Sequence, residues 1–168
     1  MTQPLLILGS SSDKGLGHTV VEAVLGARAP ETIDLQAKTI GYYDYGRENM
    51  ADDFIKVAER MAAADSIVFA TPVYWYSMSA QMKTLFDRFT DLITLRKDLG
   101  RKFKGKRCFV LAWGNDAELP AGFDVPFSST AAYFDMAYGG CFYYCTGAKA
   151  DVERRSREAV AFGRAIAF

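Results

Sequence analysis

Residues 66–90, SIVFATPVYWYSMSAQMKTLFDRFT, constrain the fold more than any other stretch of the chain. Ser66–Ala70 is short and rich in β-branched and aromatic residues, which predicts a buried strand. Thr71-Pro72 ends that strand, because proline lacks the N–H group that a sheet ladder needs. Ser77 and Ser79 then offer N-caps to a helix whose apolar residues recur at helical spacing. The stretch therefore predicts a strand, a turn and a helix in direct succession.

The predicted turn carries an unusual load of large side chains, Val73, Tyr74, Trp75 and Tyr76. Loops ordinarily avoid so much exposed aromatic surface. These residues can form a wall for a flat ligand, or they can form a hydrophobic plug between the strand and the helix. The stretch by itself does not decide between these two interpretations.

The rest of the chain repeats the alternation of apolar runs with amphipathic ones. Four more strands are expected, at Pro4–Leu8, Thr32–Leu35, Arg107–Ala112 and through Cys141–Cys145. Four more helices are expected, one after Thr19 and the others at Asp52–Ala64, Phe127–Ala137 and Asp151–Ile166. This alternation predicts a doubly wound α/β sandwich, with residues 1–168 as one domain. The basic run Leu95–Lys106 is interpreted as a solvated surface connection.

Ligands of such sheets bind at the carboxyl ends of the strands, near a topological switch point. In this chain those ends are Gly9–Thr19, Thr71–Tyr76 and Trp113–Asp116, which are also its three most unusual loops. That coincidence predicts one ligand site built from all three loops.

The first loop has the composition of a phosphate site. Its glycines let backbone N–H groups turn inward, and a helix N-terminus adds a positive dipole end. Hydroxyl donors are available at Ser10, Ser12 and Thr19, and a ring N–H at His18. The loop has neither the Gly-Lys-Ser/Thr of a P-loop nor the third glycine of a dinucleotide fingerprint. It suits the phosphate of a flavin mononucleotide better than a triphosphate, and the alternative is a glycine-rich turn with a serine N-cap.

Composition excludes several other classes. The 20 basic and 20 acidic residues balance, which argues against nucleic acid or an anionic membrane as the main partner. The first residues lack a basic n-region and no stretch reaches transmembrane length, so a cytoplasmic location is expected. Three cysteines without a C-x-x-C pair, and a single histidine, argue against a zinc or iron–sulfur site.

Three segments together resemble the flavodoxin-like NAD(P)H-dependent FMN reductases: GSSSDKGLGHT, TPVYWYSMSAQMKTLFDR and WGNDAELPAGFDVPF. The second is the most specific, and the residues at the spacing of the family are Pro72, Tyr74, Ser77, Met78, Lys83, Asp87 and Arg88. The resemblance implies a three-layer sandwich whose five-stranded parallel sheet has the order 2-1-3-4-5, with helices on both faces.

The resemblance also implies roles for individual residues. Around the FMN phosphate it places Ser10, Ser12, His18 and Thr19. Along the isoalloxazine it places Pro72, Val73, Tyr74 and Trp75, with backbone N–H groups near the pyrimidine edge. On the other side it places Trp113, Gly114 and Asn115. No side chain is assigned as catalytic, because flavin N5 carries the hydride, and a homodimer or homotetramer is expected.

The chain departs from the family in two loops. Many relatives have an arginine in the phosphate loop, where this chain has Ser12-Asp13. The loop that holds a cysteine cluster in iron–sulfur members reads Gly41-Tyr-Tyr-Asp-Tyr45 here, which argues against that branch. Its tyrosines, Tyr42, Tyr43 and Tyr45, are expected either to roof a substrate pocket or to pack together on the surface. On the third helix, Lys83, Asp87 and Arg88 are interpreted as surface charges or interface contacts.

The resulting hypothesis is an oxidoreductase that takes hydride from NAD(P)H onto FMN and then reduces a small acceptor, namely a quinone, free flavin or azo compound. The main alternative is a flavodoxin-type electron carrier, which zero net charge disfavours, since such carriers depend on a charged face. A receiver-like signalling domain would need acidic residues after the first strand, where this chain has Gly9-Ser10. A flavin-free binding module with the same fold stays open.

Overall fold

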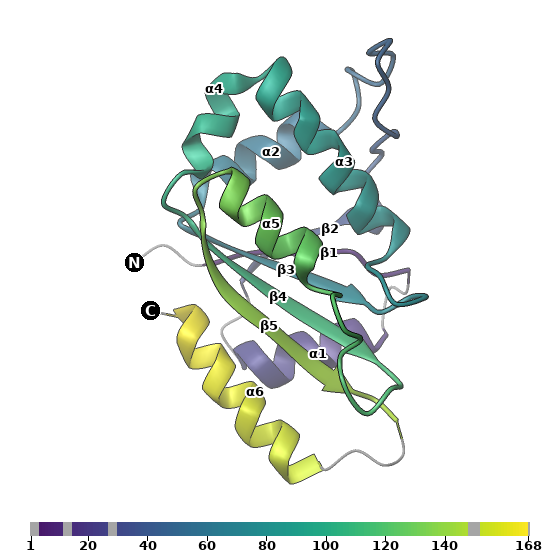
Figure 1. Cartoon of the computed structure of the whole chain (residues 1–168), viewed down its shortest axis with the longest axis vertical. Helices are drawn as coiled ribbons and strands as arrows, with labels where there is room; N and C mark the ends of the chain where they lie inside the picture. Colours follow the sequence, from purple (N-terminus) through teal and green to yellow (C-terminus); the bar gives the residue numbers. More distant parts are fainter. Residues whose placement is uncertain (1–3, 12–14, 27–29, 148–151, 168) are drawn as a thin grey trace.

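The computed structural model describes residues 4–11, 15–26, 30–147 and 152–167. Its centre is a five-stranded parallel sheet in the order β2-β1-β3-β4-β5 (Figure 1). The strands are β1 (Leu5–Leu8), β2 (Glu31–Asp34), β3 (Ser66–Pro72), β4 (Arg107–Gly114) and β5 (Ala137–Cys145). The strand order confirms the flavodoxin-like arrangement expected from the sequence.

Helices lie on both sides of this sheet (Figure 1). On one side are α1 (Leu16–Leu25) and α6 (Val152–Ala167), and on the other are α2 (Phe54–Ala63), α3 (Ala80–Thr94), α4 (Lys97–Gly100) and α5 (Val125–Tyr133). Each side buries its own hydrophobic cluster against the sheet. Two short 3₁₀ turns complete the fold, η1 (Leu35–Ala37) and η2 (Arg101–Phe103). No helix in the described ranges is both long and apolar enough to cross a membrane.

Strand β3 is buried along all seven of its residues and pairs with β1 on one side and β4 on the other. The strand runs through Thr71-Pro72 instead of ending before it, so that Pro72 lies opposite Trp113. A proline is tolerated there because the next residue takes over the ladder, with the Val73 amide donating to the Trp113 carbonyl at 2.8 Å.

The basic run at residues 95–106 is not the solvated connection that its charge suggested. It folds into α4 and η2, and it inserts Leu99 and Phe103 into the core, where they are 3% and 0% exposed. Their spacing of four residues puts both side chains on one face of a helical segment, and burying that face stabilises the ordered conformation.

Arg88 is also placed differently from the expectation of a surface charge or interface contact. Its side chain is 2% exposed, and it forms ion pairs with the buried carboxylates of Asp52 and Asp91. The Nε–Oδ2 distance to Asp91 is 2.7 Å. The guanidinium also donates to the Gly41 carbonyl at 3.1 Å and lies 4.7 Å from the ring centre of Phe54. Arg88 thus fastens both ends of the loop at residues 41–52 onto α3.

Burial by itself would lower the pKa of the Arg88 guanidinium. Hydrogen bonds and ion pairs with Asp52 and Asp91 outweigh that effect, so the pKa lies above its ordinary value. The guanidinium is therefore charged at neutral pH, and it compensates the two buried carboxylates.

We expect Arg88→Ala to lower the free energy of unfolding by about 3–5 kcal/mol, because it leaves two buried carboxylates without their counter-charge. Urea unfolding followed by circular dichroism would measure the loss. Lys83→Ala is the matched control, since its ion pair with Asp87 lies on the exposed side of the same helix and should contribute less than about 1 kcal/mol. Equal losses in the two variants would contradict the structural role given to Arg88.

Candidate functional site

The carboxyl ends of β1, β3 and β4 meet at one edge of the sheet, and the loops that follow them begin side by side. The Gly9 amide donates to the Ala70 carbonyl at 2.8 Å, and the Val73 amide donates to the Trp113 carbonyl at the same distance. These bonds continue the sheet ladder past the ends of the strands. The edge is therefore a rigid platform from which three loops project.

The start of α3 is fixed against this platform by Ser79. Its hydroxyl accepts from the Met82 amide at 3.2 Å, which confirms the predicted N-cap, and its own amide donates to the Thr71 hydroxyl at 3.0 Å. A Cβ on Gly9 would lie 3.0 Å from the Ser79 oxygen. Glycine at position 9 therefore allows the first loop to pass directly over the start of α3. Ser77, the other predicted cap, belongs to the turn instead.

The N-terminus of α1 has the features of an anion site. Its N-cap is Gly15, which makes no side-chain capping bond, and its first turn contains no acidic residue. The serine N-cap alternative therefore does not describe this helix. The His18 amide donates to the Gly15 carbonyl at 3.1 Å, and within the described residues the amides of Leu16 and Gly17 donate to no acceptor, so these two are left to bind a ligand or water. Of the four predicted phosphate residues, His18 and Thr19 are exposed on the first turn, Ser10 is buried at the end of β1, and Ser12 lies outside the described residues.

The second loop forms a tight two-residue turn between Tyr74 and Ser77. Their backbone groups exchange two hydrogen bonds, of 2.9 and 3.1 Å. The two central residues, Trp75 and Tyr76, both have positive φ, 49° and 65°. This pattern is typical of a type I′ turn, which ordinarily contains Asn and Gly. Bulky side chains in this conformation cost roughly 1–2 kcal/mol each, so the turn is strained.

The strained turn presents its aromatic side chains to solvent. The exposed fractions of Tyr74, Trp75 and Tyr76 are 49%, 92% and 70%. A hydrophobic plug would bury these rings, so the exposure favours the interpretation as a ligand wall. Within the described residues, the amides of Trp75 and Tyr76 donate to no acceptor. Behind the turn, Pro72 is buried and Val73 half-buried, which gives the wall a firm base.

β4 continues through Trp113 and Gly114, which were expected in the third loop, and the residues predicted there lie in two different environments. The side chain of Trp113 is only 5% exposed and belongs to the core under α1 and α6, where a Cβ on Gly17 would lie 3.0 Å from its ring. Its indole therefore packs away from the open edge, and only its backbone lies there. Gly114 and Asn115 follow at the edge itself, half-buried and exposed.

A residue that sequence reasoning missed, Thr146, holds this third loop. Its amide donates to the Gly114 carbonyl at 2.7 Å, and its hydroxyl donates to Asn115 Oδ1 at 2.7 Å. The bond to Oδ1 orients the Asn115 carboxamide, whose nitrogen can act as a hydrogen-bond donor. Nothing in the local sequence marks Thr146, although its place directly after β5 is a weak signal once the strand order is known.

Tyr143 ties the same loop to β5. Burial, reinforced by nearby Cys145 and Asp116, raises the pKa of Tyr143 to about 12. The phenol therefore keeps its proton at neutral pH and donates to the Asp116 carbonyl at 3.0 Å. The loop after β4 is thus fastened by Tyr143 of β5 and by Thr146 directly after that strand.

The tyrosine loop at residues 41–50 lies apart from the turn. Its anchor, Arg88, is about two helical turns beyond the start of α3. Tyr42 and Tyr45 are 79% and 92% exposed, and Tyr43 contacts Tyr45 edge-on with ring centres 5.3 Å apart. Among the described residues, no hydrogen bond between backbone groups and no aromatic ring pair joins this loop to the turn. A role for the tyrosines in roofing a pocket stays a prediction.

Thiol and metal chemistry have little support in the described residues. Burial raises the pKa of both Cys108 and Cys141 to about 12, so these thiols stay protonated and poorly nucleophilic. No group of three or more His, Cys, Asp or Glu side chains with metal-binding geometry occurs in residues 4–11, 15–26, 30–147 and 152–167. What the edge offers is hydrogen-bond donors and aromatic surface.

The strain in the turn leads to a direct test of stability. Replacing Trp75-Tyr76 by Asn-Gly should raise the free energy of unfolding of the ligand-free protein by about 1–2 kcal/mol, because the new residues adopt positive φ with less strain. Chemical denaturation measures the change. Tyr45→Asn is the control, since Tyr45 is equally exposed but has no positive φ, and it should change stability by less than about 0.5 kcal/mol. A destabilised Asn-Gly variant would show that the aromatic residues are held by contacts instead.

Curated proteins with similar sequences match short segments of the chain. YwqN of Bacillus subtilis, provisionally described as an NAD(P)H-dependent FMN-containing oxidoreductase, is 33% identical over 75 residues, which are 42% of this chain and 40% of YwqN. An iron–sulfur flavoprotein of Methanosarcina thermophila is 43% identical over 53 residues, 32% of this chain and 27% of that protein. The matched region thus spans less than half the length of either relative.

Solved structures match the chain over nearly its whole length. The Trp repressor binding protein of Bacillus subtilis superimposes with a TM-score of 0.73 at 21% identity, covering 95% of this chain and 96% of that one. General stress protein 14 of Treponema denticola, solved in complex with FMN, superimposes with a TM-score of 0.66 at 20% identity, covering 98% and 99%. At these identities the likeness establishes the flavodoxin-like fold.

The family is established by sequence. The family model for NADPH-dependent FMN reductase matches residues 3–123, which contain β1 to β4 and the three loops of the candidate site. Since this match covers well over half of the chain, the protein belongs to the NADPH-dependent FMN reductase family.

Proposed function

We propose that the chain binds FMN at the edge formed by β1, β3 and β4, takes hydride from NAD(P)H and passes electrons to a small acceptor such as a quinone, free flavin or azo compound. The observation that carries the proposal is that a helix N-terminus, whose N-cap Gly15 makes no side-chain capping bond, and an exposed aromatic turn follow neighbouring strands. The first suits a phosphate and the second a flat ring. Family membership supports the same cofactor.

The residues present fit the phosphate end of FMN. Within the described residues, the first turn of α1 offers the Leu16 and Gly17 amides, which donate to no acceptor there, and the positive end of the helix dipole. No acidic side chain in that turn repels an anion. Thr19 and His18 are exposed there and would add a hydroxyl and a ring N–H, with Ser10 and Ser12 completing the set. The first loop is braced from α3 by a hydrogen bond from the Gln81 amide to the Ser11 hydroxyl at 3.1 Å.

The residues present also fit the isoalloxazine end. Pro72, Val73, Tyr74 and Trp75 would lie along the ring system, and the unpaired amides of Trp75 and Tyr76 would donate to its pyrimidine edge. Gly114 and Asn115 would close the opposite side, with Trp113 contributing through its backbone. The strain in the turn is then the cost of directing two amides and two aromatic rings at one ligand.

Bound FMN supplies the redox chemistry, by accepting hydride at N5 and passing the electrons on. The chain supplies orientation, because the sheet ladder and the Ser79 cap hold the loops in place. Its backbone N–H groups supply positive polarity where negative charge develops on the ring. No side chain is assigned a proton-transfer role.

Further assignments are proposals of the same kind. We place the chain in the cytoplasm as one flavodoxin-like domain over residues 1–168, acting on small molecules. We also propose a homodimer or homotetramer, as the resemblance to the FMN reductase family implies.

The phosphate assignment predicts a preference for FMN over riboflavin. We expect FMN to bind at least about tenfold more tightly, because charge-assisted hydrogen bonds contribute about 1.5–3 kcal/mol. Thr19→Val should shrink that preference by several-fold while leaving riboflavin affinity unchanged, as measured by flavin fluorescence quenching. Thr94→Val, at the far end of α3, is the control. Equal affinities for the two flavins would overturn the phosphate site.

The redox assignment predicts that anaerobic NADH or NADPH bleaches the flavin absorbance of the FMN-loaded protein, and that a quinone restores it. The rates of bleaching by NADH and by NADPH at equal concentration show which nucleotide is the better hydride donor. Flavin that is retained but never bleached by either nucleotide would favour the electron-carrier alternative. If the protein retains no flavin after desalting, both the oxidoreductase proposal and the electron-carrier alternative are refuted.

A further inference from the structure

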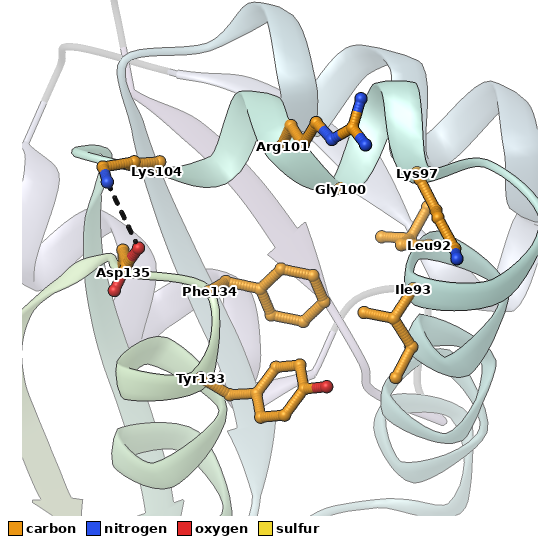
Figure 2. Close-up of a pocket in the computed structure, with 9 residues that line it drawn as sticks. All are labelled: Leu92, Ile93, Lys97, Gly100, Arg101, Lys104, Tyr133, Phe134 and Asp135. Carbon is orange, nitrogen blue, oxygen red and sulfur yellow. Dashed lines mark ion pairs between the residues drawn. The ribbon is translucent and has the colours of Figure 1, made fainter.

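A cleft of about 380 Å³ is lined by nine residues, among them Leu92 and Ile93 (Figure 2). Both belong to the C-terminal end of α3, whereas the aromatic turn precedes the N-terminal end of that helix. The cleft opens where the last residues of α3 and α5 meet α4 and η2. Since α3 has 15 residues and a helix rises about 1.5 Å per residue, the cleft is roughly 20 Å from the candidate flavin edge. It is therefore separate from the proposed cofactor site, and its volume falls within the range of small-molecule pockets.

The floor of the cleft is apolar and largely aromatic. It consists of Leu92 and Ile93 from α3 and of Tyr133 and Phe134 from the end of α5 (Figure 2). Phe134 packs against buried Phe103 with ring centres 5.4 Å apart, and Tyr133 packs edge-on against Phe134 at 5.5 Å. Tyr133 nevertheless leaves 69% of its surface exposed. The floor is thus anchored in the core and offers a free aromatic surface above it.

The walls are held in place by backbone contacts. The Gly105 amide donates to the Asp135 carbonyl at 2.9 Å, which joins the end of η2 to the end of α5. On the other side, α4 approaches α3 so closely that a Cβ on Gly100 would lie 2.3 Å from the Leu92 carbonyl oxygen. The backbone of the walls is therefore held in place before any ligand binds.

The rim of the cleft carries unbalanced positive charge. Lys104 pairs with Asp135 at 3.5 Å, but the side chains of Lys97 and Arg101 make no ion pair or hydrogen bond within the described ranges. The neighbouring acids do not compensate them, because Arg96 engages both Asp98, at 2.9 Å, and Glu59, at 3.7 Å. Two cations thus stand beside an aromatic floor without a partner.

We infer that this cleft binds a small, flat aromatic carboxylate. The ring would stack on Tyr133 against Ile93, and the carboxylate would meet Arg101, whose planar guanidinium can bind both of its oxygens, with Lys97 as a second donor. The charge of the rim selects an anion, and the aromatic floor selects a flat apolar body. This inference does not depend on the proposed function, because the cleft shares no residue with the flavin edge.

The experiment is a calorimetric titration of naphthalene-2-carboxylate into protein kept in excess FMN, with naphthalene-2-carboxamide as the neutral probe of equal shape. We expect the carboxylate to bind at least about tenfold more tightly than the amide. Arg101→Gln and Lys97→Gln should each weaken carboxylate binding about fivefold or more. Lys102→Gln, an exposed cation of the same run that does not line the cleft, should change it less than about twofold.

Three outcomes would overturn the inference. They are equal affinity for the two probes, equal weakening by Lys102→Gln and Arg101→Gln, and the absence of any binding heat. Unchanged thermal unfolding of the variants would show that they are folded. Sedimentation velocity provides a last check: if Arg101→Gln alters the oligomeric state and the carboxylate does not bind, the cleft is a contact between copies of the chain and the inference fails.

Discussion

The structure depends on the pairing of β3 with a strand on each side. All seven residues of β3 are buried, so every backbone group of the strand must find its partner in β1 or β4. That requirement brings the carboxyl ends of three strands to one edge in fixed register. The loops of the candidate site inherit their positions from this ladder, because the amides of Gly9 and Val73 continue it.

Two features of the fold are unfavourable in free energy, and the rest of the structure offsets them. The turn at Trp75-Tyr76 holds bulky residues at positive φ, and the buried cluster around Arg88 takes three charges out of water. The turn directs aromatic rings and amides toward the open edge. The cluster attaches a long loop, which has little secondary structure of its own, to the middle of α3. In both cases the unfavourable free energy, from strain or from buried charge, accompanies an arrangement that holds a loop in position.

Local sequence patterns predicted the elements well where burial is uniform. The apolar run before Thr71 marks β3, and the cap at Ser79 marks the start of α3. Patterns failed where a charged residue is buried or an apolar residue is isolated. Arg88 reads as a surface residue because its two carboxylate partners are 36 residues before it and 3 after it. The basic run of residues 95–106 reads as solvated because only two of its side chains, Leu99 and Phe103, anchor it.

The sequence by itself determined the α/β class, the strand order through its resemblance to the family, and the three loops in which a ligand site could form, because hydrophobic periodicity and turn residues are local properties. Only the tertiary structure decided which side chains face the open edge. It turned the Trp113 indole into the core, exposed Trp75 on a strained turn and brought Thr146 beside Asn115. The physical reason is that side-chain direction depends on register and packing between segments far apart in sequence, and no local pattern records those contacts.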